Sequence, residues 1–320
     1  MKLRTNYLLL PQSKQSVKDF FLDSKKTSAE INKIISTTGV DNIHVAKKKS
    51  FYGFTMSGIS QILDLNQDIF KDLEAIIAVS QTFDNRIPNI SSLIQKKLNL
   101  PSSTFCIDFV DGCNGYIKAI SISEMLISKG YSKVLIIAGD LNSSIINNAE
   151  ISTKILFGDG VGLSIFEKSD NPVRSLLFTD GDINGTISCK ADNGILSMDG
   201  FEVFRFVNSK VVKFVKDYLK NNSKKIENYN LVAMHQASKL VVSILSLSLG
   251  IKNKISSDFN CNNVGNIGAG SINAWLANIE NIDDNDEKKI LSIGYGSGLS
   301  WGLADFTLKL NKNETIYVNY

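Results

Sequence analysis

Continuous apolar runs alternate along the chain with segments whose apolar residues recur every three or four positions. The runs indicate strands buried on both faces, and the periodic segments indicate amphipathic helices. Strands are predicted in the first half at residues 73–80, 105–110, 133–140 and 160–167. Strands are predicted in the second half at 230–236, 288–296 and 301–310, with helices at 237–249 and, after a Gly-rich turn, within 263–279. This alternation predicts an α/β fold with largely buried sheets.

The second half of the chain repeats the order of elements in the first half: strand, helix, Gly-rich turn, helix, strand, strand. Such self-similarity indicates two copies of one structural unit. A polar, proline-containing segment at 167–175 separates the two copies. We therefore divide the chain into an N-terminal half, residues 1–168, and a C-terminal half, residues 169–320.

The composition is that of a globular protein with a large core, since 43% of the 320 residues are hydrophobic. The formal charge of +3 is too small to indicate a nucleic-acid-binding protein. No apolar run reaches the roughly 18 residues of a membrane span, so we expect a soluble, cytoplasmic protein. The four cysteines form no CxxC pair and predict neither a metal site nor a disulfide framework.

One cysteine stands out by its setting. Cys113 lies between two glycines in DGCNGY (111–116), where a predicted strand gives way to a predicted helix. Backbone N–H groups and the helix dipole favour a thiolate at such a helix start, so we expect a lowered pKa and a nucleophilic sulfur. The alternative is that Cys113 is a small buried apolar residue, as free cysteines often are. That interpretation is kept for Cys106, Cys189 and Cys261.

Two polar residues of the second half are candidates to act with Cys113. His235 ends an apolar strand, and strand ends of α/β folds direct side chains into a crevice. Asn266 lies at the helix start that matches the one after Cys113, although an asparagine there can also be a simple turn residue. We expect the three side chains to converge near one pseudo-twofold axis. His44, the other histidine, is interpreted as structural.

Together these segments resemble β-ketoacyl-acyl-carrier-protein synthase III, a condensing enzyme family of the thiolase superfamily. The matching stretches follow in order along nearly the whole chain: TTGV (37–40), SSLIQKKLNL (91–100), DFVDGCNGYIKA (108–119), KVLIIAGD (133–140), ILFGDGVG (155–162), LSMDGFEVFRF (196–206), AMHQAS (233–238), NVGNIGAGS (263–271) and GYGSGLSWG (294–302). The resemblance implies a thiolase fold, with duplicated halves in a five-layer αβαβα sandwich, and a homodimer.

The resemblance also implies an activity. Cys113 takes the acyl group of an acyl thioester, and backbone N–H groups of Cys113 and Ser297 hold the oxyanion. His235 and Asn266 then stabilise the enolate that forms when malonyl-acyl carrier protein loses CO₂, and the resulting carbanion attacks the acyl group. Neither a metal nor a cofactor is needed. The implied partners are an acyl carrier protein and a second copy of the chain, with no nucleic acid and no membrane.

Some positions differ from the family or leave alternatives open. Ser297 stands in a segment where the family usually has three glycines, and it is strained if its φ is positive. Ile87 lies where many members have a phenylalanine that enters the partner's acyl pocket; it either admits a bulkier primer or is plain interface packing. Lys210, Lys213 and Lys216 recur every three positions, and they form either a docking face for an acidic carrier protein or a solvated charged face.

The family's grip on coenzyme A is missing from this sequence. Where members have a tryptophan and two arginines, the chain has Lys33, Thr37 and Ile151, and Ser238 replaces an asparagine near the path of the pantetheine arm. A lysine offers a phosphate only a point charge and cannot stack on adenine. We therefore predict that an acyl carrier protein delivers the primer. The alternative is coenzyme A bound through other lysines, such as those at 47–49.

Two other functions are compatible with the resemblance. One is transfer of the acyl group from Cys113 to an oxygen or nitrogen nucleophile, which in relatives typically accompanies changes at the His or Asn position. The other is a non-catalytic partner subunit, which an intact Cys113 disfavours. Retention of His235 and Asn266 favours condensation. The primer, the cognate carrier protein and the choice between fatty acid and specialised biosynthesis are left open.

Overall fold

The computed structural model describes residues 1–147, 150–190, 194–251, 258–279 and 286–320. Its strands are β1 (Lys2–Pro11), β2 (Lys14–Ser16), β3 (Asn42–His44), β4 (Ala75–Val79), β5 (Phe105–Phe109), β6 (Lys133–Leu141), β7 (Asp159–Glu167), β8 (Arg174–Thr179), β9 (Ile187–Cys189), β10 (Leu196–Met198), β11 (Leu231–Met234), β12 (Lys288–Gly296) and β13 (Ser300–Val318). Its α-helices are α1 (Ser28–Thr38), α2 (Phe51–Leu65), α3 (Ile90–Lys97), α4 (Gly115–Ser128), α5 (Ile151–Lys154), α6 (Gly200–Phe206), α7 (Val212–Asn221), α8 (Lys239–Ser248) and α9 (Ser271–Ala277). A π-helical turn, η3 (Val207–Val211), joins α6 to α7, and a 3₁₀ turn, η5 (Gly268–Gly270), precedes α9.

Nine strands form one continuous sheet in the order β11-β12-β13-β1-β7-β6-β4-β5, with β8 beside β13. The two ends of this sheet share one pairing pattern. In the N-terminal half β4 pairs with β6 in parallel, and β6–β7 and β7–β1 are antiparallel. In the C-terminal half β11 pairs with β12 in parallel, and β12–β13 and β13–β8 are antiparallel. The predicted α/β fold with duplicated halves is thus confirmed.

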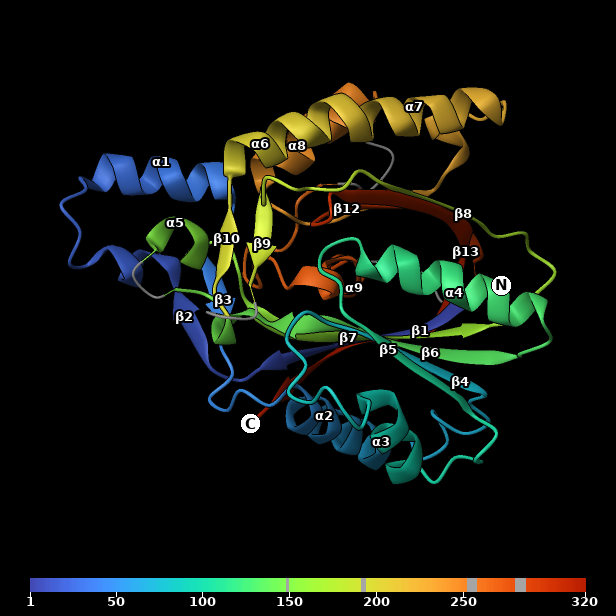
Figure 1. Ribbon diagram of the computed structural model, residues 1–320. Coiled ribbons are helices and arrows are strands. Elements are labelled where there is room, and N and C mark those ends of the chain that lie inside the picture. The colour runs from blue at the N-terminus through green and yellow to red at the C-terminus, as the bar shows by residue number, and fades with distance from the viewer. Residues whose placement is uncertain (148–149, 191–193, 252–257, 280–285) are drawn as a thin grey trace.

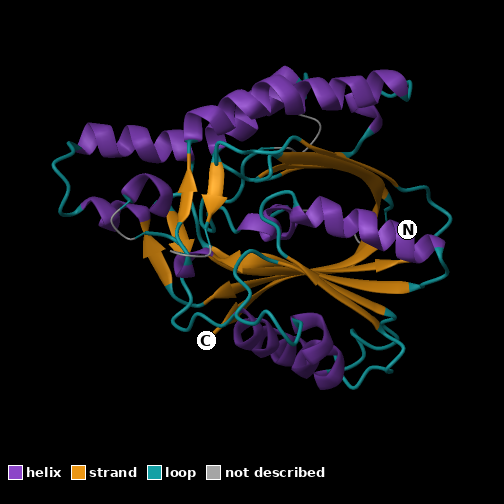
Figure 2. Ribbon diagram, in the orientation of Figure 1, coloured by secondary structure: helices purple, strands orange, loops and turns teal. Residues whose placement is uncertain are grey.

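Helices and strands alternate in five layers (Figures 1 and 2). Helices α2 and α3 cover the outer face of the N-terminal strands, and α6 to α8 cover the outer face of the C-terminal strands. Helices α4 and α9 lie between the two sets of strands, where Ile117 and Ile120 of α4 share one apolar core with Ile272 and Trp275 of α9. Because both central helices are enclosed, residues at their N-terminal ends lie inside the molecule.

The helix boundaries near the centre follow from local sequence. Helix α8 starts at Ser238, whose hydroxyl accepts a hydrogen bond from the backbone N–H of Val241. Serine is a preferred N-cap residue because its oxygen satisfies a backbone donor that the helix leaves unpaired. Ser238, which replaces an asparagine of the family, therefore has a structural role at the helix start. In α1, Thr27 and Glu30 form a reciprocal capping box, and Gly39 ends the helix with φ 77°.

The predicted strands lie where expected, and the differences are a longer β13 and strands that were not predicted: β1, β2, β3, β8, β9 and β10. Strand β1 was not predicted, and β13 continues to Val318 beyond the predicted end at residue 310. The second part of β13 pairs in parallel with β1, from Lys2 opposite Thr307 to Pro11 opposite Val318. The polar residues of NKNET (311–315) hide this pairing from hydrophobic patterning, since the strand is stabilised by its neighbour. The division at residue 168 stays a prediction, and the end of the chain pairs with the N-terminal half.

The connection between the halves runs from the end of β7 at Glu167 to the start of β8 at Arg174, within the predicted segment. FGDGVG leads directly into β7, which begins at Asp159. None of the helices in the described ranges is long and apolar enough to cross a membrane.

Candidate active site

Cys113 lies in the turn between β5 and α4, at the carboxyl end of a parallel pair of strands. Asn114 is the N-cap residue of α4, so Cys113 lies one residue before the N-cap. The turn is tight because Gly115 packs against β4: a Cβ on Gly115 would come within 2.5 Å of the Val79 side chain. Cys113 as a whole is intermediate between buried and exposed. It therefore faces a space between the central helices and the strand ends.

The three residues singled out in the sequence line one cavity. Cys113, His235 and Asn266 enclose it together with Ser297. The cavity is narrow, about 40 Å³. Its other lining residues are mainly apolar: Gln81, Phe157, Ile187, Leu196, Met198, Val203, Ala237, Tyr295 and Gly296. The structure thus brings the thiol, the imidazole and the carboxamide together from both halves of the chain, in surroundings that hold little water.

The surroundings of Cys113 contradict one expectation. The pKa of its thiol is raised to about 12, first by burial and then by the negative charges of Asp140 and Asp111. A hydrogen bond from the side chain of Asn266 favours the thiolate without offsetting these effects. The predicted lowering of the pKa was wrong because a helix dipole is weaker than burial next to two carboxylates. The resting thiol is neutral.

His235 follows β11 and is only 2% exposed. Burial lowers its pKa to about 3, so its imidazole is neutral at pH 7. The ring lies edge-on to that of Tyr295, with centroids 5.3 Å apart, and the Tyr295 hydroxyl donates to the His235 carbonyl over 2.9 Å. Nδ1 has no hydrogen-bond partner within the described residues. A neutral imidazole offers one N–H donor and one acceptor.

Asn266 is held by both its backbone and its side chain. Its N–H donates to the Leu156 carbonyl over 2.8 Å, and its carbonyl accepts from the N–H of Gly158 over 3.1 Å. Its Oδ1 accepts from the N–H of Gly268 over 2.9 Å and from the Ser271 hydroxyl over 3.1 Å. With the oxygen engaged, the amide nitrogen is the group directed to the thiol. Asn266 therefore presents a hydrogen-bond donor to the cavity.

The segment after β12 brings backbone close to the thiol. A Cβ on Gly296 would lie 2.6 Å from the Cβ of Cys113, so only glycine fits there. Ser297, the predicted oxyanion-hole residue, follows directly and lines the cavity. The non-glycine residues with positive φ in the described part of the chain are Asp72, Asn99 and Ser223, so Ser297 does not carry the strain considered above.

Sequence reasoning missed Asp140, which is fully buried at the end of β6. Its carboxylate accepts from the Ser80 hydroxyl over 2.8 Å and the Gln81 N–H over 2.7 Å in one half, and from the Ala269 N–H over 3.2 Å in the other. Burial raises its pKa to about 7. The sequence signal for Asp140 is its position as the last residue of the apolar run KVLIIAGD (133–140). The end of that strand lies at the same edge of the sheet as Cys113.

The remaining sequence candidates lie outside the cavity. Ile87 is 88% exposed in the single chain and does not contact the Cys113 cavity of its own chain. Lys210 pairs with Asp180, and Lys213 pairs with Asp217 over 2.6 Å. Both lysines line a second, largely apolar cavity of about 390 Å³ between α7, β8 and β13, and Lys216 does not line it. All three lysines are exposed, and their role as a docking face stays a prediction.

The positions that correspond to the family's coenzyme A grip are also described. Lys33 and Thr37 are exposed on α1, and the Thr37 hydroxyl donates to the Lys33 carbonyl over 2.8 Å. Ile151 packs in the apolar cluster between α1 and α5. Of the alternative lysines, Lys49 pairs with Asp159, and Lys48 lies over the Tyr320 ring.

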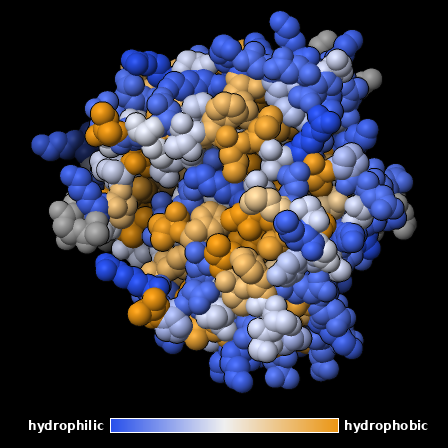
Figure 3. All heavy atoms as spheres, turned by 45° about the vertical axis from the view of Figure 1, so that its right-hand side comes forward, coloured by the Kyte–Doolittle hydropathy of each residue, from blue (hydrophilic) through white to orange (hydrophobic). Residues whose placement is uncertain are grey.

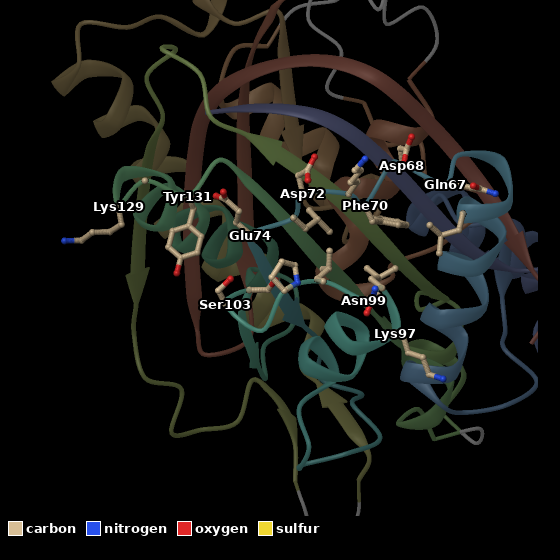
Figure 4. Close-up of a pocket in the computed structure, with 18 residues that line it drawn as sticks. Gln67, Asp68, Phe70, Asp72, Glu74, Lys97, Asn99, Ser103, Lys129 and Tyr131 are labelled. Atoms are coloured by element: carbon tan, nitrogen blue, oxygen red, sulfur yellow. The ribbon is translucent and has the colours of Figure 1, made fainter.

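A larger cavity of about 830 Å³ lies at the opposite, amino ends of β4, β5 and β6 (Figure 4). Its charged side chains include Asp72, Glu74, Lys97 and Lys129, and its lining contains no cysteine or histidine. No cluster of His, Cys, Asp and Glu suited to a metal ion occurs among the residues that the structure describes. Nδ1 of His44 donates to the Pro11 carbonyl over 2.5 Å, in keeping with a structural role.

Comparisons with known proteins match this site. The family model for 3-oxoacyl-[acyl-carrier-protein (ACP)] synthase III matches residues 107–182, which contain Cys113. The chain is 28% identical over 300 residues to the β-ketoacyl-[acyl-carrier-protein] synthase III of Acholeplasma laidlawii, covering 88% of this chain and 94% of that protein. It is also 28% identical to the synthase III of Streptococcus sanguinis, covering 86% of this chain and 90% of that protein.

Solved structures give the same fold. A 3-oxoacyl-(acyl-carrier protein) synthase from Burkholderia xenovorans superposes with a TM-score of 0.89 at 23% identity, covering 99% of this chain and 97% of that one. The synthase III of Aquifex aeolicus superposes with a TM-score of 0.82 at 23% identity, covering 95% and 99% of the two chains. The predicted thiolase-type fold is confirmed. The predicted resemblance is therefore confirmed: the chain is similar along most of its length to β-ketoacyl-acyl-carrier-protein synthase III condensing enzymes.

Proposed function

We propose that this protein is a condensing enzyme that takes an acyl group onto Cys113 and joins it to the two-carbon unit of malonyl-acyl carrier protein with loss of CO₂. The observation that carries the proposal is the convergence of Cys113, His235 and Asn266 on one narrow, largely apolar cavity. The named activity of the synthase III relatives supports it.

In the first half-reaction Cys113 attacks the carbonyl carbon of an acyl thioester. The C–S bond to the donor breaks, and the donor thiol leaves with the proton that the Cys113 thiol gives up. Because that thiol is neutral at rest, proton loss accompanies attack. We assign stabilisation of the tetrahedral oxyanion to the N–H groups of Cys113 and Ser297.

In the second half-reaction the C–CO₂⁻ bond of the malonyl group breaks, and its electron pair becomes an enolate. His235 and Asn266 each provide a donor for the enolate oxygen: the neutral imidazole has one N–H, and the Asn266 oxygen is already engaged by Gly268 and Ser271. The enolate carbon then forms a bond to the acyl carbon, and the Cys113 sulfur leaves and is reprotonated. An apolar cavity strengthens both hydrogen bonds and favours release of neutral CO₂ from a carboxylate.

We also infer that two copies of the chain form the working enzyme. Strand β5 is the last strand of the sheet, so its outer edge has no strand neighbour in the described chain. Apolar side chains are exposed near it and on β8: Val110, Met125, Leu176, Leu177 and Phe178. Figure 3 shows apolar side chains gathered on the face that includes this side of the molecule. Exposed Ile87 is then available to enter the partner's acyl pocket.

The carrier protein is the proposed partner for both substrates. Neither Lys33 nor Thr37 nor Ile151 offers the stacking ring or the bidentate guanidinium that would hold coenzyme A. Lys48 and Lys49 are engaged with Tyr320 and Asp159, which weakens the alternative of a rebuilt coenzyme A site. Transfer to an oxygen or nitrogen nucleophile is not favoured, because both donors for decarboxylation are present.

The test is to incubate the protein with an acyl thioester and malonyl-acyl carrier protein, and to follow CO₂ release and intact mass. We expect an acyl adduct on the peptide containing Cys113, then CO₂ and β-ketoacyl-carrier protein. Cys113→Ala should abolish the adduct, and Cys189→Ala, which changes an exposed thiol of β9, should not. An adduct that persists in Cys113→Ala, or turnover without CO₂ release, would refute the proposal.

A further inference from the structure

Asp140 is a buried carboxylate that no step of the proposed reaction uses. It lies where the two halves of the chain meet, since its oxygens accept hydrogen bonds from Ser80 and Gln81 after β4 and from Ala269 before α9. A Cβ on Gly268 would come within 1.8 Å of its Oδ2, so the turn before α9 presses directly on the carboxylate. One side chain thus ties together two loops from opposite halves.

Both loops carry residues of the cavity. Gln81 lines it directly, and its side chain donates to Oδ1 of Asn142 over 3.2 Å. Asn266 lies two residues before Gly268, and its Oδ1 is the acceptor for the Gly268 N–H. A shift of the 268–269 turn would therefore move the Asn266 carboxamide that points to the thiol.

The charge of Asp140 is felt at the thiol and is not neutralised locally. Of the charged groups acting on Cys113, Asp140 contributes most to destabilising the thiolate and Asp111 contributes next. Asp111 is paired with Lys118. No lysine, arginine or histidine lies within salt-bridge distance of Asp140 in the described ranges, and the groups that contact it are hydroxyls and backbone N–H groups from the β4 loop and the turn before α9.

We propose that Asp140 is a positioning residue of the condensing site, which fixes the β4 loop against the Asn266 turn and, through its negative charge, adds to the effect of burial in disfavouring the Cys113 thiolate. The role rests on the proposed function of Cys113 and Asn266. Its electrostatic part concerns the free protein and needs no substrate.

The charge of Asp140 should affect how Cys113 of the unmodified protein reacts as the pH changes. The pKa of Asp140 is about 7, so the carboxyl is neutral below that pH and charged above it. A neutral Asp140 destabilises the thiolate less. The measurement is the rate of Cys113 alkylation by iodoacetamide, followed by mass spectrometry of the Cys113 peptide. In a plot of the logarithm of this rate against pH, the points below about pH 7 should lie above the straight line extrapolated from high pH. Interacting groups show such a break, and an isolated thiol does not.

Asp140→Asn should remove the break and raise the alkylation rate at a given pH above 7, by about tenfold for each unit by which the thiol pKa falls. The matched control is Asp159→Asn, a second fully buried carboxylate that bonds to Ala46 and Ser143 and is not among the charges that act on Cys113. It should leave the alkylation profile unchanged.

The positioning role of Asp140 is tested by a second measurement, the rate of malonyl decarboxylation. An asparagine cannot accept the Ala269 N–H through its amide nitrogen, so Asp140→Asn should also slow malonyl decarboxylation while Cys113 alkylation speeds up. Opposite signs for the two readouts would not follow from general unfolding. A wild-type profile with no break near pH 7, or an equal shift in Asp159→Asn, would overturn the inference. Failure of the wild-type protein to condense substrates would instead overturn the proposed function and leave the alkylation result standing.

Discussion

Gly296 and Cys113 lie so close that a single methyl group cannot be inserted between their backbones: a Cβ at position 296 would be 2.6 Å from the Cβ and 3.4 Å from the Sγ of Cys113. The contact joins the end of β12 in one half to the turn after β5 in the other. It fixes the distance from the thiol to the N–H of Ser297, the second donor of the proposed oxyanion hole.

Gly296→Ala should therefore displace Cys113 or Ser297 and slow acylation at least about tenfold, a loss smaller than that from removing an oxyanion donor altogether. The measurement is the rate of acyl-enzyme formation in a single turnover. Gly181→Ala is the control, because a Cβ at 181 meets no atom within 4 Å. Equal acylation rates for the wild-type protein and Gly296→Ala would contradict the role given to this contact.

Asn266→Asp removes the donor that the second half-reaction needs. The new carboxylate keeps an oxygen for Gly268 and Ser271 but loses the donor and adds a negative charge beside the thiol. Decarboxylation of malonyl-carrier protein by the acylated enzyme should fall at least about 100-fold, as for loss of one preorganised donor. His235→Ala should have a similar effect on CO₂ release and leave acylation of Cys113 largely intact. Wild-type condensation by either variant would favour transfer to another nucleophile.

Because the pKa of His235 is lowered in the folded state, this residue should make the protein less stable as the pH falls. The folded-state pKa is about 3 and the ordinary value is 6.5, so the unfolded chain binds the proton first as the pH falls. The folded state should lose stability between pH 6.5 and 3, with a slope of up to about 1.4 kcal/mol per pH unit from this group alone. His235→Gln should remove that slope in urea unfolding at pH 5 and 6.

Asp140 has the opposite sign, since its pKa is raised and the folded state keeps its proton to higher pH. Asp140 is present in both His235→Gln and the wild-type protein, so its contribution to the pH slope cancels when the two are compared. Lys216→Gln, a change at an exposed residue, is the control. If the pH slope of unfolding is the same with and without His235, the buried neutral imidazole is not present in solution.

The lysines of the proposed docking face should differ in how much each contributes to binding of malonyl-carrier protein. Lys216 has no ion pair within the described chain, whereas the charge of Lys213 is already offset by Asp217. Lys216→Glu should therefore raise the KM for malonyl-carrier protein more than Lys213→Glu does, and should flatten its salt dependence. Lys97→Glu, on α3 at the other side of the molecule, controls for net charge. Equal, unchanged KM values for all three variants would mean that this helix is only a solvated charged face.

The primer should be accepted more readily from a carrier protein than from coenzyme A. The reason is that α1 and α5 offer Lys33, Thr37 and Ile151 in place of a nucleotide grip. The measurement is kcat/KM for one acyl group presented on each donor. A matched substitution, Thr37→Arg, should improve use of the coenzyme A ester alone by restoring a bidentate phosphate contact. Equal or better use of the coenzyme A ester by the unmodified protein would refute this prediction.

The sequence by itself determined the class of fold, the repeat and the three residues that line the proposed site. Apolar runs such as KVLIIAGD report strands buried on both faces, because burial constrains every position of the run. The glycines around Cys113 and before α9 mark close turns, and the repeat places Cys113 and Asn266 at matching helix starts. These signals are local or periodic, so they are visible in the sequence without knowledge of the tertiary structure.

Tertiary structure alone decided the chemistry of those residues. The Cys113 thiol has a raised and not a lowered pKa, because Asp140 and Asp111 come from separate segments and burial depends on both halves closing around α4. The polar end of β13 becomes a strand because β1, some 300 positions earlier, lies beside it. Lys210 is paired with Asp180, an acidic neighbour from another segment that helical spacing does not reveal. Burial and charge at a point sum over the whole folded chain, and linear order does not specify that sum.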